Sequence, residues 1–235
     1  MRRLCVHLLP LILGLGLAGA GLALAAGLIR IPDRWNPFAP PVIADAPNLL
    51  TGWKIARLKD APDQCLTVLK TGPLSFTPVP DRQTAETCGF ENAVRVGNAG
   101  DPRFSSGFTA SCPLMVAWSI FERHVLQPAA RRHFATRVTR IDHLGTYACR
   151  PVRGGSTPSQ HATANAIDIA GMVLADGTRI SLTHDWSGDD ARKRAFLRDL
   201  RDGACEVFRG VLGPDYNAAH RDHFHLDMGR WTICR

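Results

Sequence analysis

Two short stretches decide the fold and the chemistry of this chain: residues 159–169, which read SQHATANAIDI, and residues 220–227, which read HRDHFHLD. In the first stretch Asp168 stands between two isoleucines, a setting typical of a buried strand. A carboxylate in such a strand needs a partner on its own face, because burying it unpaired is costly. The partner has to come from elsewhere in the chain, and the second stretch offers several candidates.

The second stretch alternates apolar and polar residues, which is the pattern of a strand with one buried face. Such a strand places His223, His225 and Asp227 on one face, while Phe224 and Leu226 point into the core. Two neighbouring imidazoles repel each other once both are protonated. The histidine pair therefore indicates either a bound metal ion or neutral, oriented rings.

A divalent cation would satisfy His161, Asp168 and His225 together. Two imidazoles, one carboxylate and an open position for water form the ligand set of a catalytic zinc site, so we expect Zn²⁺ here. The competing interpretation makes them separate structural residues: a turn aspartate, a capping histidine and surface histidines. The spacing H-x-x-H-x-H beside a distant H-x6-D favours the metal site. Four other histidines are not part of such a motif: His124, His133, His143 and His184.

The elements around these stretches predict an α+β fold with a small antiparallel sheet and flanking helices. The clearest helix has a capping serine, a proline in its first turn and an apolar stripe. The Asp176–Gly177 pair is a strong turn signal and predicts a hairpin. The expected helices are Asp60–Gly72, Ser111–Ala130 and Asp189–Phe208, and the expected strands are Ala93–Val96, Arg137–Asp142, Thr146–Arg150, Ala166–Val173, Thr178–Thr183 and Phe224–Met228.

An apolar run without charged residues spans residues 4–29 and follows two arginines. About 20 apolar residues suffice to cross a bilayer, so we expect residues 1–31 to form an uncleaved membrane anchor. The alternative is a cleaved signal peptide with a small-residue cleavage site at Ala23–Ala25. Either segment exports the rest of the chain, so we expect a periplasmic domain tethered to the inner membrane. Residues 32–48 hold five prolines and predict a spacer, and residues 49–235 are expected to form one domain.

The net charge of +7 over 235 residues invites a nucleic-acid partner. Three of the arginines, Arg2, Arg3 and Arg30, flank the apolar run, and the remaining 205 residues hold 25 basic and 21 acidic side chains, a balance of +4. No RNP, zinc-finger or basic-helix signature occurs in that remainder. We therefore expect a mildly basic solvated surface and no nucleic-acid partner, whereas the oligomeric state stays open.

Seven cysteines are present, and all but Cys5 lie in the exported part. An even number of cysteines in an oxidising compartment predicts three disulfides that stabilise the domain. No C-x-x-C pair occurs, which argues against a thiolate zinc site. Six cysteines permit fifteen pairings. Among them we expect Cys65–Cys88, Cys112–Cys149 and Cys205–Cys234.

The first stretch carries a resemblance to a known group of enzymes. Its Ser159-x-His161-x-x-Ala164-x-Ala166-x-Asp168 is similar to the S-x-H-x-x-G-x-A-x-D motif of the D-Ala-D-Ala metallopeptidases, with alanine in place of the glycine. Across most of residues 35–235 the chain also resembles the bacterial extensin-like C-terminal domain family. The stretches TYACR, SQHATANAIDI and GPDYNAAHRDHFHLD carry that second resemblance.

The second stretch contains an H-x-H motif at His223 and His225. It looks like the motif shared by lysostaphin-type enzymes, D-Ala-D-Ala peptidases and the hedgehog signalling domain. The spacing from His220 is similar to that in penicillin-insensitive murein endopeptidases. The resemblance implies a hedgehog/D-Ala-D-Ala peptidase-like fold in which His161, Asp168 and His225 ligate Zn²⁺.

The identity of the general base stays open. The D-Ala-D-Ala peptidases place a glutamate where this chain has Asp222, whereas the murein endopeptidases use additional histidines, which match His220 and His223. We favour the two histidines, because Asp222 should point away from His223 if the strand is regular.

Two further residues are candidates for contact with the substrate. Arg150 either binds a substrate carboxylate, stabilises an oxyanion or forms a plain surface salt bridge. Ser159 either bonds the metal-site loop or only shapes the turn that follows Pro158.

The leading hypothesis for function is a zinc-dependent peptidase or amidase acting on peptidoglycan or its stem peptides. The alternatives are a cell-envelope binding protein that keeps the metal without catalysis, and a disulfide-stabilised wall-binding module without metal.

Overall fold

The computed structural model describes residues 30–152 and 154–235, together with positions 14, 16, 19, 21, 22, 27 and 28. The chain divides into two compact units, Met1–Pro37 and Phe38–Arg235. Most of the expected anchor, residues 1–31, lies outside the described residues. Among the residues that are described, no helix is both long enough and apolar enough to cross a membrane.

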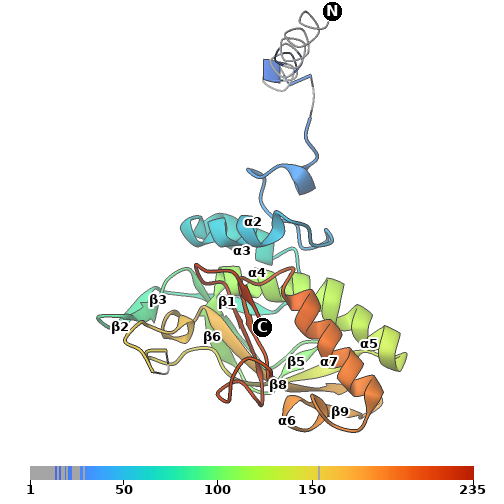
Figure 1. The fold of residues 1–235 in the computed structure, drawn as a ribbon. Helices are drawn as coiled ribbons and strands as arrows, with labels where there is room; N and C mark the ends of the chain where they lie inside the picture. The colour runs from blue at the N-terminus through green and yellow to red at the C-terminus, as the bar shows by residue number, and fades with distance from the viewer. Residues whose placement is uncertain are drawn as a thin grey trace, which may run out of the picture. The chain divides into compact units, whose positions relative to one another are not determined.

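A mixed sheet forms the centre of the second unit (Figure 1). In the described part of the chain it has seven strands in the order β12-β10-β11-β8-β7-β5, with β9 paired to β8. Its strands are β5 (Arg103–Phe104), β7 (Val138–Gly145), β8 (Ala166–Leu174), β9 (Arg179–Ser181), β10 (Gly210–Leu212), β11 (Phe224–Asp227) and β12 (Ile233–Cys234). The pairs β5–β7 and β10–β12 are parallel, and the others are antiparallel. The expected α+β class is confirmed, with a larger sheet than predicted.

Two smaller sheets complete the β-structure of the described residues. One is antiparallel, with the order β1-β4-β6, and the other is the β2–β3 hairpin. Their strands are β1 (Phe76–Val79), β2 (Arg82–Ala85), β3 (Cys88–Phe90), β4 (Ala93–Val96) and β6 (Phe108–Ser111). The chain passes from β6 directly into the main helix, where Ser111 forms the N-cap.

The main helix begins as predicted and changes pitch halfway along. Ser111 Oγ accepts the N–H of Leu114, and Pro113 occupies the first turn. The helical segment consists of α4 (Cys112–Phe121), the π-helical turn η3 (Glu122–Leu126) and α5 (Gln127–Phe134). Every residue of α4 is buried, so this helix forms the middle of the core.

The other helices pack around α4 and the sheet. Helices α2 (Thr51–Arg57) and α3 (Pro62–Leu69) pack on α4, and α7 (Ala191–Ala204) packs beside α5 (Figure 1). Gly203 of α7 approaches Val125 so closely that a Cβ atom would lie 2.4 Å from its methyl carbon. The remaining helical elements are η1 (Asp33–Trp35), η2 (Leu58–Asp60), η4 (Gln160–Thr163) and α6 (Leu182–Asp185).

Local signals predicted some elements well and others poorly. The hairpin through Asp176–Gly177 is confirmed, with Gly177 at φ +86° and the Asp176 carboxylate accepting the N–H of Thr178. The strand expected at Thr146–Arg150 is wrong, because this segment is an irregular loop whose backbone bonds the turn at His161.

Two of the three expected disulfide pairings are wrong. The described chain contains Cys65–Cys112, Cys88–Cys149 and Cys205–Cys234, of which only the last was predicted. Cys65 meets Cys112 because α3 packs on α4, and both residues are fully buried. Cys88 then joins Cys149 and ties the β2–β3 hairpin to the loop that precedes η4. Sequence spacing could not reveal this choice, because packing between distant elements decides it.

Removing the Cys88–Cys149 disulfide should destabilise the protein strongly. The bridge joins residues 61 positions apart. By closing a loop of that length, the bridge lowers the entropy of the unfolded chain, which stabilises the fold by about 4 kcal/mol. We expect the double Cys→Ala variant to lose about this much of its free energy of unfolding. Urea denaturation measures this loss. A loss below about 1 kcal/mol would show that the loop is held by its other contacts instead.

Candidate metal centre

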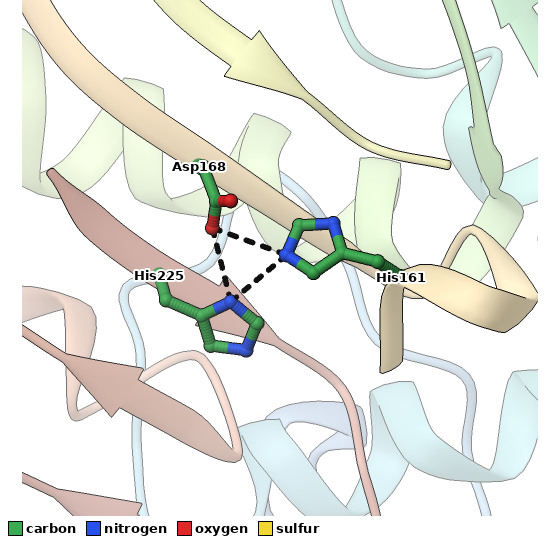
Figure 2. A group of neighbouring side chains, drawn as sticks. All are labelled: His161, Asp168 and His225. Carbon is green, nitrogen blue, oxygen red and sulfur yellow. Dashed lines mark hydrogen bonds and ion pairs between the residues drawn. The ribbon is translucent and has the colours of Figure 1, made fainter. Parts of the chain in front are cut away.

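Three polar side chains converge where β8 and β11 run side by side (Figure 2). Asp168 of β8 and His225 of β11 are direct cross-strand partners, so their side chains leave the sheet on the same face. His161 lies on η4, the short turn that leads into β8. Ser159 caps this turn, because its Oγ accepts the N–H of His161. The structure thus brings together the three residues predicted as zinc ligands.

The spacing of their polar atoms matches a small coordination sphere. Asp168 Oδ1 lies 3.2 Å from His161 Nε2 and 3.0 Å from His225 Nδ1, and the two nitrogens are 3.1 Å apart. Neighbouring ligand atoms around a tetrahedral zinc ion with bonds of about 2.0–2.1 Å lie about 3.3–3.4 Å apart. The three atoms therefore need to move only a few tenths of an ångström to share such an ion.

The hydrogen bonds behind both histidines fix which ring nitrogen faces the centre. His161 Nδ1 lies 3.0 Å from the carbonyl oxygen of Thr146, which can only accept, so Nδ1 carries the proton. His225 Nε2 donates to Asp227 Oδ2 over 2.9 Å. In their neutral forms, His161 Nε2 and His225 Nδ1 then both present lone pairs to the centre. Carboxylate and carbonyl partners behind ligating histidines are the usual arrangement of metal sites.

Three electron-rich atoms this close together require a positive charge between them. All three side chains are largely shielded from solvent, with side-chain exposures of 4% for His161, 14% for Asp168 and 11% for His225. Burial opposes a charge on His225, but hydrogen bonds to Asp168 and Asp227 outweigh it and raise its pKa to about 9. Burial likewise opposes the charge of Asp168, while the neighbouring imidazoles of His161 and His225 hold its pKa well below the usual range. The donor set thus fits a cation. When no metal is bound, a proton on His225 takes the place of that cation.

Zinc affinity should therefore rise with pH. His225 has to lose its Nδ1 proton to become a ligand, and this proton is held below the raised pKa of about 9. Because one proton competes with the metal, we expect about a tenfold gain in affinity per pH unit below that value. Titration calorimetry in two buffers of different ionisation enthalpy should detect about one proton released per zinc near pH 7. A pH-independent affinity would contradict this assignment.

A glycine opposite Asp227 makes room for the carboxylate behind His225. Gly210 of β10 pairs with Asp227 across the sheet, and a Cβ atom at Gly210 would lie 2.1 Å from Asp227 Oδ2. The other carboxylate oxygen accepts the N–H of Gly229 over 2.6 Å. The lack of a side chain at Gly210 leaves room for the oxygen that accepts from His225 Nε2, and the bond from Gly229 holds the carboxylate in place.

Replacing Gly210 by Ala should therefore weaken metal binding without touching a ligand. The new methyl group displaces the Asp227 carboxylate, and loss of such a partner typically lowers metal affinity about 10–100-fold. Competition with a zinc-binding dye measures the change. The matched control is Gly52→Ala on α2, where a Cβ atom meets nothing closer than 3.6 Å. Equal zinc affinities for the two variants would contradict the role given to Gly210.

His223 stands at the edge of the centre with a carboxylate behind it. Its Nε2 lies 3.6 Å from Asp168 Oδ1, and its Nδ1 donates to Asp222 Oδ1 over 2.8 Å. The expectation that Asp222 points away from His223 is wrong, because β11 begins only at Phe224 and the preceding residues form a turn. Asp222 is half exposed and orients the ring, so that the lone pair of Nε2 faces the centre.

His220 contacts the rings of two further histidines and a tyrosine at edge-on or tilted angles. Its ring centre lies 5.3 Å from that of His223, 5.8 Å from that of His225 and 5.5 Å from that of Tyr216. Its Nδ1 donates to Asn217 Oδ1 over 2.8 Å. Burial, followed by the charges of the two neighbouring histidines, lowers the pKa of His220 to about 4. His220 is therefore a neutral imidazole at physiological pH.

The two residues predicted to contact substrate lie on the loop between β7 and η4. The backbone carbonyl of Arg150 accepts the N–H of Ser159, which closes this loop at its base. The Arg150 side chain is exposed, and its positive charge contributes to the lowered pKa of His220. Arg150 thus lies near the histidine group, while Ser159 acts here as the cap of η4.

Sequence reasoning missed the supporting contacts of the centre. The Thr146 carbonyl is a backbone group, and no side-chain pattern marks it. Asp227 was placed on the correct face, but its bond to His225 and its dependence on Gly210 were not foreseen. The nearest sequence signal is the H-x-D spacing of residues 225–227, which places a carboxylate beside the preceding histidine of a strand.

Fold and site together define a disulfide-linked α+β domain with a candidate metal centre of two histidines and one aspartate. Residues 63–235 match the family model described as Extensin-like protein C-terminus, and the chain belongs to this family. No curated protein and no solved structure matched the chain. The match covers all elements of the centre, from η4 through β8 to β11.

Proposed function

We propose that this protein is a zinc-dependent peptidase or amidase that acts on peptidoglycan peptides in the periplasm, tethered to the inner membrane by residues 1–31. One observation carries the proposal. Three electron-rich atoms, from His161, Asp168 and His225, converge within 3.2 Å beside a further imidazole that is oriented by its own carboxylate. A ligand set with an adjacent base is the arrangement that metal-assisted hydrolysis requires.

The backbone at Ala164 supports the resemblance to D-Ala-D-Ala metallopeptidases. Those enzymes have glycine at this position of the motif, and Ala164 adopts a left-handed conformation with φ +52°, which glycine favours. The backbone between His161 and Asp168 thus has, at Ala164, the conformation that a glycine at this position of the motif would adopt easily. The substitution therefore leaves the proposed ligand geometry in place.

The residues of the centre have separable tasks in the proposed reaction. A bound zinc ion would supply Lewis-acid polarisation of the scissile carbonyl and would acidify water. His223 would accept a proton from the attacking water at Nε2 and return it to the leaving amine, while Asp222 holds its ring through Nδ1. His220, neutral at physiological pH, would add no positive charge to this exchange.

Charge and location favour peptidoglycan stem peptides as the substrate. Stem peptides of peptidoglycan carry several carboxylates, and the exposed guanidinium of Arg150 lies near the histidine group. The uncharged run of residues 4–29 would keep the domain beside the cell wall. Three disulfides suit that oxidising compartment.

Digestion of purified muropeptides tests the proposal. Zinc-loaded protein is incubated with cross-linked and uncross-linked muropeptides, and the products are identified by mass spectrometry. We expect the loss of a peptide or amide bond, which stops after chelation and returns when zinc is added back. No cleavage of any muropeptide by zinc-loaded protein, beside an active reference enzyme, would contradict the proposal.

A further inference from the structure

Exposed apolar side chains are concentrated in one short part of the chain. Twelve large apolar residues among those described are exposed, and six of them lie between residues 31 and 53. The six are Ile31, Trp35, Phe38, Val42, Leu49 and Trp53. Four of the six lie in the second unit. Single exposed apolar residues are normal on a soluble protein, whereas several that lie close together mark a contact surface.

Helix α2 shows how the second unit presents part of this group. Its inner side buries Ile55, whereas Trp53 and Arg57, four residues apart, share the outer side and remain exposed. The guanidinium of Arg57 lies 4.9 Å from the ring centre of Trp53 and 5.9 Å from that of Phe38. Phe38 is 77% exposed, and Leu49, just before the helix, is 98% exposed. We call these four residues, Phe38, Leu49, Trp53 and Arg57, the α2 surface.

We propose that the α2 surface rests on the bilayer and contacts anionic phospholipid headgroups. Aromatic residues favour the boundary between headgroups and acyl chains, and a guanidinium close to aromatic rings can pair there with a lipid phosphate. Phe38 follows the apolar run of residues 4–29 by nine positions, so even a fully extended connection is only about 30 Å long. The inference rests on the proposed membrane location and is independent of the metal chemistry.

The chemistry of the α2 surface favours lipid over other occupants. Leu49 and Phe38 present large apolar areas to solvent, while a cation accompanies the aromatic rings. This combination is typical of segments that lie in the membrane interface. The short connection keeps a bilayer close at hand, whereas a second copy or another protein would have to be recruited.

Nitroxide labels on the full chain in phosphatidylglycerol-containing vesicles test the contact. Labels are attached at Leu49→Cys or, as the matched control, at Leu144→Cys, which is also exposed but lies on β7. Cys5 is replaced by serine in both variants, so that the label reacts only at the new cysteine. Collisions with oxygen, which enters lipid, are compared with collisions with a water-soluble nickel chelate.

We expect a several-fold higher oxygen-to-nickel ratio at position 49 than at position 144. Adding Phe38→Ser and Trp53→Ser should bring the ratio at position 49 down to that of the control. Equal ratios in a chain that floats with the vesicles would overturn the inference while leaving the anchor in place. Spin–spin broadening at position 49 that is independent of lipid would assign the surface to a second copy. A chain that does not float with vesicles would overturn the membrane location together with this contact.

Discussion

Replacing Asp168 by Asn is expected to abolish zinc binding and, with it, any hydrolytic activity. The substitution keeps the shape of the side chain but removes the one negative charge between the two imidazoles. Asp168 is a proposed ligand, so the affinity should fall by more than the roughly 10–100-fold that the loss of a partner behind a ligand costs. Elemental analysis after dialysis and a dye competition assay measure the loss.

The matched control for this variant is His184→Ala. His184 lies on α6, outside the proposed centre, and its side chain is exposed. We expect wild-type zinc content and activity from it. Circular dichroism of both proteins establishes that the fold is intact. Retention of one tightly bound zinc ion by Asp168→Asn would show that the metal has other ligands.

Replacing His223 by Ala is expected to remove catalysis while leaving zinc in place. The Nε2 atom of His223 faces the centre from outside the three proposed ligands, at 3.6 Å from Asp168 Oδ1. Loss of a general acid–base group typically lowers kcat about 10²–10⁴-fold. Muropeptide turnover is measured together with the zinc content, so that a loss of metal cannot be mistaken for a loss of the base.

Asp222→Asn separates orientation from proton transfer. It keeps a bond to His223 Nδ1 possible but removes the negative charge behind the ring, so we expect a smaller loss of kcat than in His223→Ala. Wild-type turnover by zinc-loaded His223→Ala would contradict the role of His223 as the base, whereas an unaffected phenotype would favour the alternative, an envelope protein that keeps a metal without catalysis.

The sequence predicted the proposed ligands better than the contacts that hold them in place. Alternation along residues 223–227 predicted which face His225 occupies, and the isoleucines beside Asp168 predicted its buried strand. Both are local patterns with the period of a strand, and the cross-strand pair of Asp168 and His225 agrees with them. The hairpin at Asp176–Gly177 was predictable for the same reason, because a turn is encoded by adjacent residues.

Features that depend on distant packing were not predictable. Cys65 pairs with Cys112 because α3 packs on α4, and no spacing rule contains that contact. The Thr146 carbonyl sets the tautomer of His161 from a loop that local propensity presents as a strand. Asp222 was misplaced because the alternation of a strand was applied to residues 222 and 223, which lie in the turn before β11. Each error concerns a contact between elements or the exact end of an element.

X-ray absorption spectroscopy of the zinc-loaded protein shows directly whether His161, Asp168 and His225 bind one zinc ion. We expect one zinc per chain with nitrogen and oxygen neighbours at about 2.0–2.1 Å and the scattering pattern of two imidazoles. The His225→Ala variant should lose one imidazole from that pattern or bind no zinc. Less than stoichiometric zinc in the wild-type protein, or a zinc shell unchanged by His225→Ala, would contradict the account.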